Sequence, residues 1–269
     1  MKHLPLYCML AMPLYLFGQK DYSVIYKKTA TQELHIEILE PKGKMPKEGF
    51  PAVVFFFGGG WKGGETKQFI EQAKHLQNHG ILSFLVDYRT QKSAGTSPRE
   101  SLMDAKSAMR YIKTHAKNLN INPQKIAASG GSAGGHLAAA TCYIQSFNDP
   151  ADNLDVSPKP AALILFNPVI DNSKDGYGYE RVKDYYQEFS PIHNIKKPVP
   201  TIFFVGSQDT LISPHIAENY KRKCEELGGR CDLHIYQGRN HGFFNYGKKD
   251  YQSTMNLTMA FLKSVQFIK

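Results

Sequence analysis

The sequence predicts an α/β fold in which helices cover both faces of a mainly parallel sheet. Short apolar runs alternate along the chain with longer segments typical of helices. Strands that alternate with helices need crossover connections, and such connections join parallel strands. Most of the runs are continuously apolar, as in strands buried on both faces. No internal repeat interrupts the 269 residues, a length that suits one large domain.

The elements predicted before residue 130 begin with a half-exposed strand at 34–38, where apolar and polar side chains alternate. A turn rich in Pro, Gly and Lys follows over 41–50. The other predicted elements are continuous apolar strands at 52–57, 81–86 and 125–129, and helices at about 67–79 and 101–117.

The later part of the chain continues the alternation except over 171–197. The predicted elements are strands at 162–166, 201–205 and 233–236, and helices at about 215–227 and 251–267. Residues 171–197 are polar and rich in tyrosine, and they contain no clear strand. Two interpretations of this insertion fit: a small lid or substrate wall over the sheet, or a plain surface excursion.

A serine in a glycine-rich turn lies at the centre of this pattern. The apolar strand ends in Gly130-Gly131-Ser132-Ala133-Gly134, and an alanine-rich segment follows over 137–141. This predicts a strand, a very tight turn and a helix, because glycine tolerates the close approach that such a turn needs. The G-x-S-x-G spacing is that of a nucleophile elbow, which presents the serine hydroxyl at a helix N-terminus. We therefore predict Ser132 as the nucleophile.

Asp209 and His241 are the predicted partners of Ser132. A serine hydroxyl becomes nucleophilic when a base takes its proton, and the base needs a third group to orient it. Asp209 follows the strand at 201–205, and His241 follows the strand at 233–236. Both positions lie at the carboxyl ends of strands and keep the order Ser, acid, His.

The glycine run after the strand at 52–57 predicts an oxyanion hole. The backbone N–H groups of Gly59 and Gly60 can approach a developing negative charge, because no side chain crowds them. Ala133, directly after the nucleophile, offers a third N–H group. Trp61 continues the run, and we expect it to bind substrate by walling a small pocket together with the tyrosine-rich insertion.

Neighbouring polar residues are predicted to be structural. His136 lies one turn into the helix behind the serine, so it points along that helix and not at the hydroxyl. Asp87 and Arg89 follow a strand upstream of the serine, and an ion pair that includes Asp104 is the expected arrangement.

With these motifs placed, nearly the whole chain after residue 18 resembles the α/β-hydrolase superfamily. The stretches that resemble its esterase/lipase branch are Phe57-Gly58-Gly59-Gly60-Trp61, Asp87-Tyr88-Arg89, Gly131-Ser132-Ala133-Gly134-Gly135-His136-Leu137 and Asn240-His241-Gly242-Phe243. That branch includes hormone-sensitive-lipase-like enzymes and bacterial acetyl xylan and feruloyl esterases. It usually has His where Phe57 stands and often Asp where Gly131 stands, and the combination here is closer to secreted carbohydrate esterases. The resemblance implies an α/β-hydrolase fold and a carboxylic ester hydrolase.

The expected activity is hydrolysis of short acyl or aromatic acyl esters of polysaccharide through an acyl-enzyme. The expected partner is an oligosaccharide or small-molecule ester, without cofactor or metal. An amide hydrolase is the alternative, because kynurenine formamidases share a similar glycine run and Ser-Ala-Gly-Gly-His, and prolyl-oligopeptidase-type peptidases share the domain. An inactive binding module is disfavoured, because such proteins typically lose a triad member and this chain keeps all three. The sequence leaves the oligomeric state open.

The N-terminus and the charge bear on location. Lys2 and His3 precede an apolar stretch over 4–17, which is typical of a signal peptide. We therefore expect a signal peptide at 1–18, a catalytic domain at 19–269 and a secreted or periplasmic protein. No other stretch approaches the ~20 apolar residues of a membrane span. The net charge is +9, but the lysines are dispersed, which predicts a basic solvated surface and no nucleic-acid site.

Three cysteines follow the predicted signal peptide. Cys142 is expected to be a buried free thiol in the helix after the elbow. Cys224 and Cys231 flank a helix end that turns into a strand. For an exported protein a bridge between these two and a pair of free thiols both fit the sequence.

Overall fold

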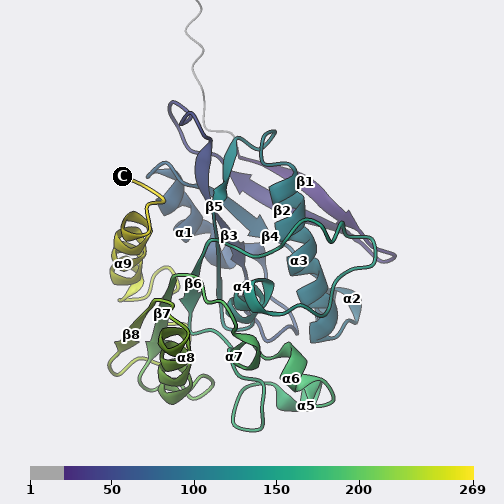
Figure 1. Ribbon diagram of the computed structural model, residues 1–269, viewed down its shortest axis with the longest axis vertical. Coiled ribbons are helices and arrows are strands. Elements are labelled where there is room, and N and C mark those ends of the chain that lie inside the picture. Colours follow the sequence, from purple (N-terminus) through teal and green to yellow (C-terminus); the bar gives the residue numbers. More distant parts are fainter. Residues whose placement is uncertain (1–20) are drawn as a thin grey trace, which may run out of the picture.

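The computed structural model describes residues 21–269, and its centre is an eight-stranded sheet with the order β1-β2-β4-β3-β5-β6-β7-β8 (Figure 1). Only β2 runs against the other strands, because it is antiparallel to both β1 and β4 while every other pair is parallel. The predicted, mainly parallel sheet is thereby confirmed. The strands are β1 Asp21–Lys28, β2 Glu33–Leu39, β3 Phe50–Phe56, β4 Leu82–Val86, β5 Ile121–Gly131, β6 Ala162–Phe166, β7 Thr201–Gly206 and β8 Cys231–Tyr236.

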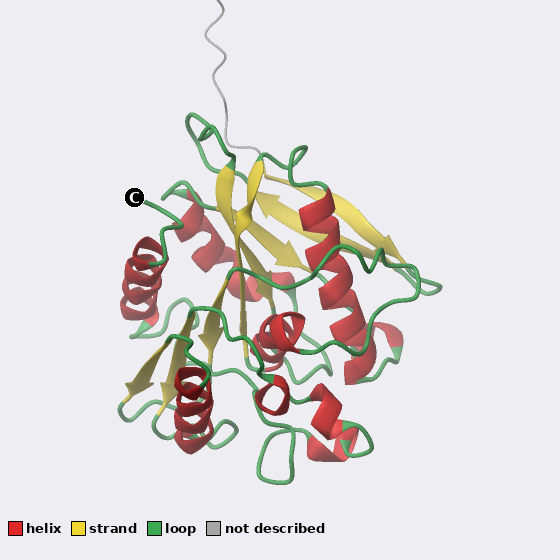
Figure 2. Cartoon of the chain, viewed as in Figure 1, coloured by secondary structure: helices red, strands yellow, loops and turns green. Residues whose placement is uncertain are grey.

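Helices cover both faces of this sheet (Figure 2). One face packs against α3 (Pro98–Thr114), α4 (Ala133–Tyr143) and α8 (Pro214–Glu226). The other packs against α1 (Ile70–Gln77) and α9 (Tyr251–Ser264). Alternate side chains of each central strand enter the two cores, as the pleat requires. The short helices are η1 Thr66–Phe69, α2 Gln91–Ala94, α5 Tyr179–Val182, α6 Tyr186–Phe189 and α7 Pro191–Asn194.

Helix α3 begins earlier than the sequence predicts. The side chain of Ser97 accepts a hydrogen bond from the backbone N–H of Arg99, and Glu100 accepts one from the N–H of Ser97. This capping box satisfies backbone donors that a helix start otherwise leaves open. Pro98 then suits the first helical position, where no N–H is needed. α3 therefore starts at Pro98 and not near residue 101.

Two further features differ from the sequence-based expectations. β1 was not predicted, although it pairs with β2 at the edge of the sheet. The segment 171–197 contains no strand, as expected, but it contains three short helices, α5 to α7, that were not predicted. Cys224 and Cys231 are both free thiols, so the bridge that the sequence left open is not formed. Burial raises the pKa of the Cys224 thiol to about 11.

Of the ion pair predicted for Asp87, Arg89 and Asp104, the contact of Arg89 with Asp104 is confirmed, whereas Asp87 forms no ion pair within residues 21–269. Arg89 donates from Nε and Nη2 to the two oxygens of Asp104, at 2.8 and 2.7 Å. Lys27 of β1 adds a third contact, at 2.7 Å from the same carboxylate. Because Asp104 is fully buried, two cations compensate its charge and tie β1 to α3.

Within residues 21–269, no helix combines the length and apolar character needed to cross a membrane. The predicted signal peptide at 1–18 lies outside the described residues.

Candidate functional site

Ser132 lies at the turn between β5 and α4. Its backbone has φ 53° and ψ −121°, a conformation that is sparsely populated for residues other than glycine. The Ser132 N–H donates to the carbonyl oxygen of Phe166 at 3.0 Å, and the Ser132 carbonyl accepts from Val169. A side chain at position 134 would overlap the carbonyl oxygens of Phe56 and Phe57, so glycine is required there. The G-x-S-x-G motif thus has a direct steric basis.

Asp209 and His241 form a hydrogen-bonded pair after β7 and β8. His241 Nδ1 donates to Asp209 Oδ2 at 2.8 Å. The other oxygen, Oδ1, accepts the backbone N–H groups of Leu211 and Ile212, at 2.9 and 3.0 Å. Because an ionised carboxylate only accepts hydrogen bonds, Nδ1 carries the proton of the neutral ring. The second ring nitrogen, Nε2, is then available as a base.

Ser132 and His241 line one cavity of about 230 Å³. The cavity lies at the carboxyl ends of the parallel strands, since its lining residues follow β3, β5, β6, β7 and β8. The lining residues are Gly58, Gly59, Gly60, Gln68, Ser132, Asn167, Tyr177, Leu211, His241, Gly242, Phe244 and Asn245. The structure thus brings the three predicted catalytic residues together, with Asp209 behind His241.

The glycine run after β3 forms one wall of this cavity. Gly59 and Gly60 have φ values of 127° and 63°, which glycine adopts without strain. Within residues 21–269 their N–H groups have no hydrogen-bond acceptor. Ala133 is the first residue of α4, directly beside Ser132. These positions suit donors that an oxyanion would engage.

Three side chains fix the glycine run in place. Tyr88 donates from its hydroxyl to the carbonyl oxygen of Phe57 at 2.6 Å. Gln68 accepts the N–H of Gly58 at 2.6 Å, and its amide donates to Asn245 at 3.3 Å. The guanidinium of Arg181 donates to the carbonyl oxygen of Gly60. The run is therefore held from both the sheet and the 171–197 segment.

The structure corrects the expected substrate contact of Trp61. Its side chain is 1% exposed and is absent from the cavity lining. The indole packs edge-on against His136 and Phe189. Trp61 has φ 57°, and its ring lies among buried side chains. Tyr177 is the aromatic side chain that the 171–197 segment contributes to the cavity.

His136 is structural, as its position in the helix predicts. It is fully buried, and its Nε2–H donates to the carbonyl oxygen of Phe189 at 2.8 Å. Burial lowers its pKa to about 3, so the ring stays neutral at neutral pH.

Five side chains of the cavity lining were not predicted from the sequence: Gln68, Asn167, Leu211, Phe244 and Asn245. Asn167 follows β6 as Asp209 follows β7, and that strand-end position was a usable signal. Gln68 and Asn245 lie in a short helix and a loop, where no sequence pattern marks them.

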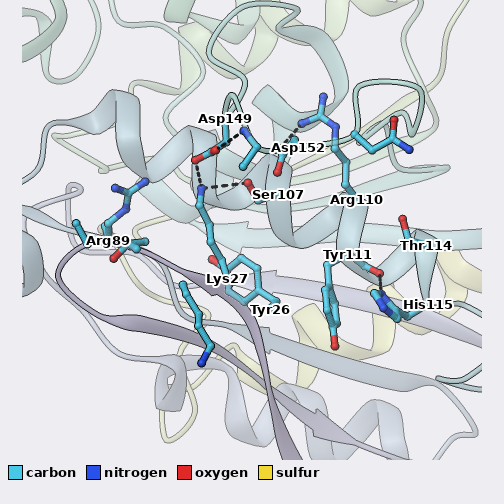
Figure 3. A pocket seen from close by; sticks show the side chains of 15 residues that line it. Tyr26, Lys27, Arg89, Ser107, Arg110, Tyr111, Thr114, His115, Asp149 and Asp152 are labelled. Carbon is cyan, nitrogen blue, oxygen red and sulfur yellow. Dashed lines mark hydrogen bonds and ion pairs between the residues drawn. The ribbon is translucent and has the colours of Figure 1, made fainter.

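A larger cavity, of about 630 Å³, lies between β1, α3 and the loop after α4 (Figure 3). Lys27 forms an ion pair with Asp149 at 2.6 Å, and Arg110 forms one with Asp152 at 2.8 Å. None of the predicted catalytic residues lines this cavity, and these four charges compensate one another.

Comparisons with known proteins agree on one superfamily. The profile of the BD-FAE family matches residues 36–173, and that of the prolyl oligopeptidase family matches residues 166–265. The propionate-bound Est2 esterase of Thermogutta terrifontis is 35% identical, with a TM-score of 0.86 over 94% of this chain and 97% of that one. The apo form of the same esterase matches with a TM-score of 0.87 over 97% of this chain and 99% of that one.

Curated relatives are more distant. An acetylxylan esterase of Xylanibacter ruminicola is 26% identical over 71% of this chain and 41% of its own length. A probable isoprenylcysteine alpha-carbonyl methylesterase of Oryza sativa is 26% identical over 71% of this chain and 50% of its own. The chain thus spans half or less of these two relatives. Together with the sheet order and the elbow, the profile and structure matches show that the chain belongs to the BD-FAE family of α/β-hydrolases and is a carboxylesterase-type hydrolase.

Proposed function

We propose that the protein is a serine esterase that removes short acyl groups from polysaccharide, with Ser132, His241 and Asp209 as its catalytic triad. The observation that carries this proposal is the 2.8 Å hydrogen bond from His241 to Asp209, with Ser132 in the wall of the same cavity. The nucleophile, the base and the group that orients the base then occupy the roles that ester hydrolysis needs.

In the proposed reaction His241 Nε2 takes the Ser132 proton as Ser132 Oγ attacks the ester carbonyl carbon. The carbonyl electron pair moves to oxygen, and the N–H groups of Gly59, Gly60 and Ala133 stabilise the oxyanion. The C–O bond to the alcohol then breaks, and the alcohol leaves with the proton from His241. Water repeats the two steps on the acyl-enzyme and releases the acid, which restores Ser132.

The size of the cavity supports a short acyl group. Its volume of about 230 Å³ is below the ~300–1,000 Å³ typical of sites for drug-sized ligands. Its lining includes two bulky side chains, Tyr177 from the 171–197 segment and Leu211 from the Asp209 loop. Propionate and butyrate are bound in structures of the Thermogutta terrifontis esterase.

A polysaccharide substrate is supported by the match to an acetylxylan esterase. Export of the protein, expected from residues 1–18, is part of the same proposal, because plant and algal polysaccharides lie outside the bacterial cell. Feruloyl esters are the second acyl class within it, and their larger acyl group would need space beyond the cavity.

The test compares acetate and ferulate release from defined oligosaccharides with hydrolysis of nitrophenyl esters. We expect acetate release to exceed ferulate release. The Ser132→Ala variant should lose ~10⁶-fold in kcat, as in comparable triads, with an unchanged circular dichroism spectrum. Retention of more than about a thousandth of the wild-type kcat would exclude Ser132 as the nucleophile.

An amide hydrolase is the second candidate, and the prolyl oligopeptidase match over residues 166–265 favours it. The same triad would cleave a C–N bond, as in kynurenine formamidase-like or peptidase-like enzymes. Assays with N-formylkynurenine and a chromogenic peptide amide separate the candidates. A kcat/KM for either amide above that for nitrophenyl acetate would favour amide chemistry.

A further inference from the structure

Asn167 is a buried side chain that lies between the catalytic loops. It directly follows β6, is 0% exposed and has φ 34°, a left-handed conformation that Asn and Asp tolerate better than most residues. Its N–H donates to the carbonyl oxygen of Phe204 at 2.6 Å, which fixes its backbone against β7. The side chain therefore starts from a rigid position at the carboxyl end of the sheet.

The two ends of the Asn167 amide are assigned by their partners. The backbone N–H of Gly242 donates to Oδ1 at 3.0 Å. Since that N–H can only donate, the oxygen must face Gly242 and the NH₂ group must face the other side. There, Nδ2 lies 3.4 Å from Nε2 of His241. Nε2 is consequently the acceptor of a hydrogen bond from the NH₂ group of Asn167.

We propose that Asn167 is a positioning residue that holds His241 in the neutral form with the proton on Nδ1 and the lone pair on Nε2. Asp209 accepts from Nδ1 and Asn167 donates to Nε2, so the two ring nitrogens are assigned from opposite sides. This is the form that can take the serine proton, and in that step the Ser132 O–H replaces the Asn167 N–H at the Nε2 lone pair. The inference rests on the proposed function of the triad.

The same contact opposes the protonated ring. An imidazolium would point its Nε2–H at the NH₂ group of Asn167, and Gly242 prevents the amide from turning its oxygen there. After proton transfer, the leaving alcohol oxygen is then the acceptor that remains for Nε2–H. Asp209 is ion-paired with the ring, and the charged and titratable side chains of the surrounding segments are Tyr177 in the cavity lining, Arg181, which donates to Gly60, and Arg239, which is paired with Asp250.

Asn167→Asp is the most informative variant. It keeps an oxygen for Gly242 and the tolerance for left-handed backbone, but it replaces the donor to Nε2 with an acceptor. We expect kcat to fall by roughly 10–100-fold, within the range that general acid–base groups contribute, with KM changed less than about twofold. The acidic limb of the kcat profile should move to higher pH, because an acceptor favours the protonated ring.

Two further variants keep the result interpretable. Asn167→Gly removes the side chain without backbone strain and should lower kcat. Because it also removes the group that opposes the protonated ring, it should move the acidic limb in the same direction as Asn167→Asp, but by less. Asn172→Asp makes the matched change at another fully buried asparagine, whose amide donates to the carbonyl oxygen of Tyr177 and not to His241. Asn172→Asp should leave the acidic limb in place.

A nuclear magnetic resonance measurement on ¹⁵N-histidine-labelled protein provides a readout apart from activity. The Nε2 signal of His241, assigned by its loss in His241→Gln, should be that of an acceptor nitrogen in the wild type and of an N–H in Asn167→Asp at neutral pH. An N–H at Nε2 in the wild type, or an unchanged acidic limb in a folded, active Asn167→Asp, would overturn the inference. Absence of ester hydrolysis by the wild type would instead overturn the proposed function.

Discussion

At the scale of single residues, the carboxylate of Asp209 is fixed before any substrate binds. Its side chain is fully buried, and one oxygen accepts the N–H groups of Leu211 and Ile212. The other oxygen faces only His241 among its hydrogen-bond partners in the described structure. The imidazole is therefore oriented by a group that cannot rotate away, which reduces the reorganisation needed during proton transfer.

Asp209→Asn should lower kcat by up to ~10⁴-fold while the fold is kept, as in the serine protease triad. Leu211 and Ile212 would hold the amide oxygen, so the NH₂ group would face Nδ1 and the ring proton would move to Nε2. Steady-state kinetics with nitrophenyl acetate, together with thermal melting, measure the two effects separately.

The matched control is Asp171→Asn, because Asp171 also follows a late strand. Its Oδ1 accepts the N–H of Ser173 at 2.8 Å, within its own loop. We expect near wild-type kcat for this variant. A strong loss of activity in Asp171→Asn, together with normal activity in Asp209→Asn, would show that Asp171 and not Asp209 is the acid of the triad.

Strand ends are the signal by which the sequence predicts these catalytic candidates. Ser132, Asp209 and His241 each follow an apolar strand, and parallel strands bring their carboxyl ends to one edge. Asn167 occupies the same kind of position, but an asparagine carries no chemistry of its own to draw attention. The direction in which the Trp61 side chain points depends on a left-handed backbone conformation at that residue, and the neighbouring residues in the sequence do not reveal this conformation.

At the scale of elements, the 171–197 segment is attached to the glycine run and does not stand free of it. Arg181 of α5 donates to the carbonyl oxygen of Gly60, and its guanidinium lies 5.1 Å from the ring of Trp61 and 5.2 Å from that of Tyr177. Cation–π contacts of this kind stabilise by about 0.5–2 kcal/mol each. The segment thus fixes Tyr177 as a wall of the cavity, which supports the interpretation as a substrate wall.

This arrangement predicts a preference for short acyl chains that Tyr177 sets. The wild type should hydrolyse acetate and propionate esters best in a nitrophenyl series up to palmitate. Tyr177→Ala should raise kcat/KM for longer chains relative to acetate, because it removes a side chain that bounds the cavity.

Tyr179→Ala is the control, since Tyr179 packs on Tyr186 and does not line the cavity. Its chain-length profile should match that of the wild type. A wild-type kcat/KM that rises beyond about eight carbons would show that this cavity does not bound the acyl group.

Strands were predictable from sequence where both faces are buried, because such strands are continuously apolar. β6 matches its predicted bounds, whereas β1 was missed. β1 lies at the edge of the sheet with one face exposed, and its polar positions resemble a loop. Its Tyr22, Val24 and Tyr26 nevertheless alternate and pack on the core, which is the signal that a period-two search would use.

At the scale of the whole molecule, His136 joins three parts of the chain. It belongs to α4, stacks on Phe189 of α6 with ring centres 4.3 Å apart, and contacts Trp61 of the glycine run edge-on at 5.1 Å. A charge on this ring would be buried without a counter-ion hydrogen-bonded to it in the described structure. Protonation must therefore weaken the packing between the elbow helix, the insertion and the glycine run.

The lowered pKa of His136 makes the stability of the protein depend on pH. Burial lowers that pKa from 6.5 to about 3, so between these values the unfolded chain binds a proton that the folded chain does not. The contribution of neutral His136 to the free energy of unfolding is fully present above pH 6.5. It is lost as the pH falls from 6.5 towards 3, at about 1.4 kcal/mol per pH unit. His136→Gln should remove this part of the slope of unfolding free energy between pH 6.5 and 4, measured by urea titration.

His215→Gln is the control, because the His215 side chain is 88% exposed. The unfolding free energy of this variant should depend on pH as steeply as that of the wild type. If His136→Gln kept the full wild-type slope, the acid sensitivity would have to come from other groups, among them His75 and His234, whose pKa values burial also lowers.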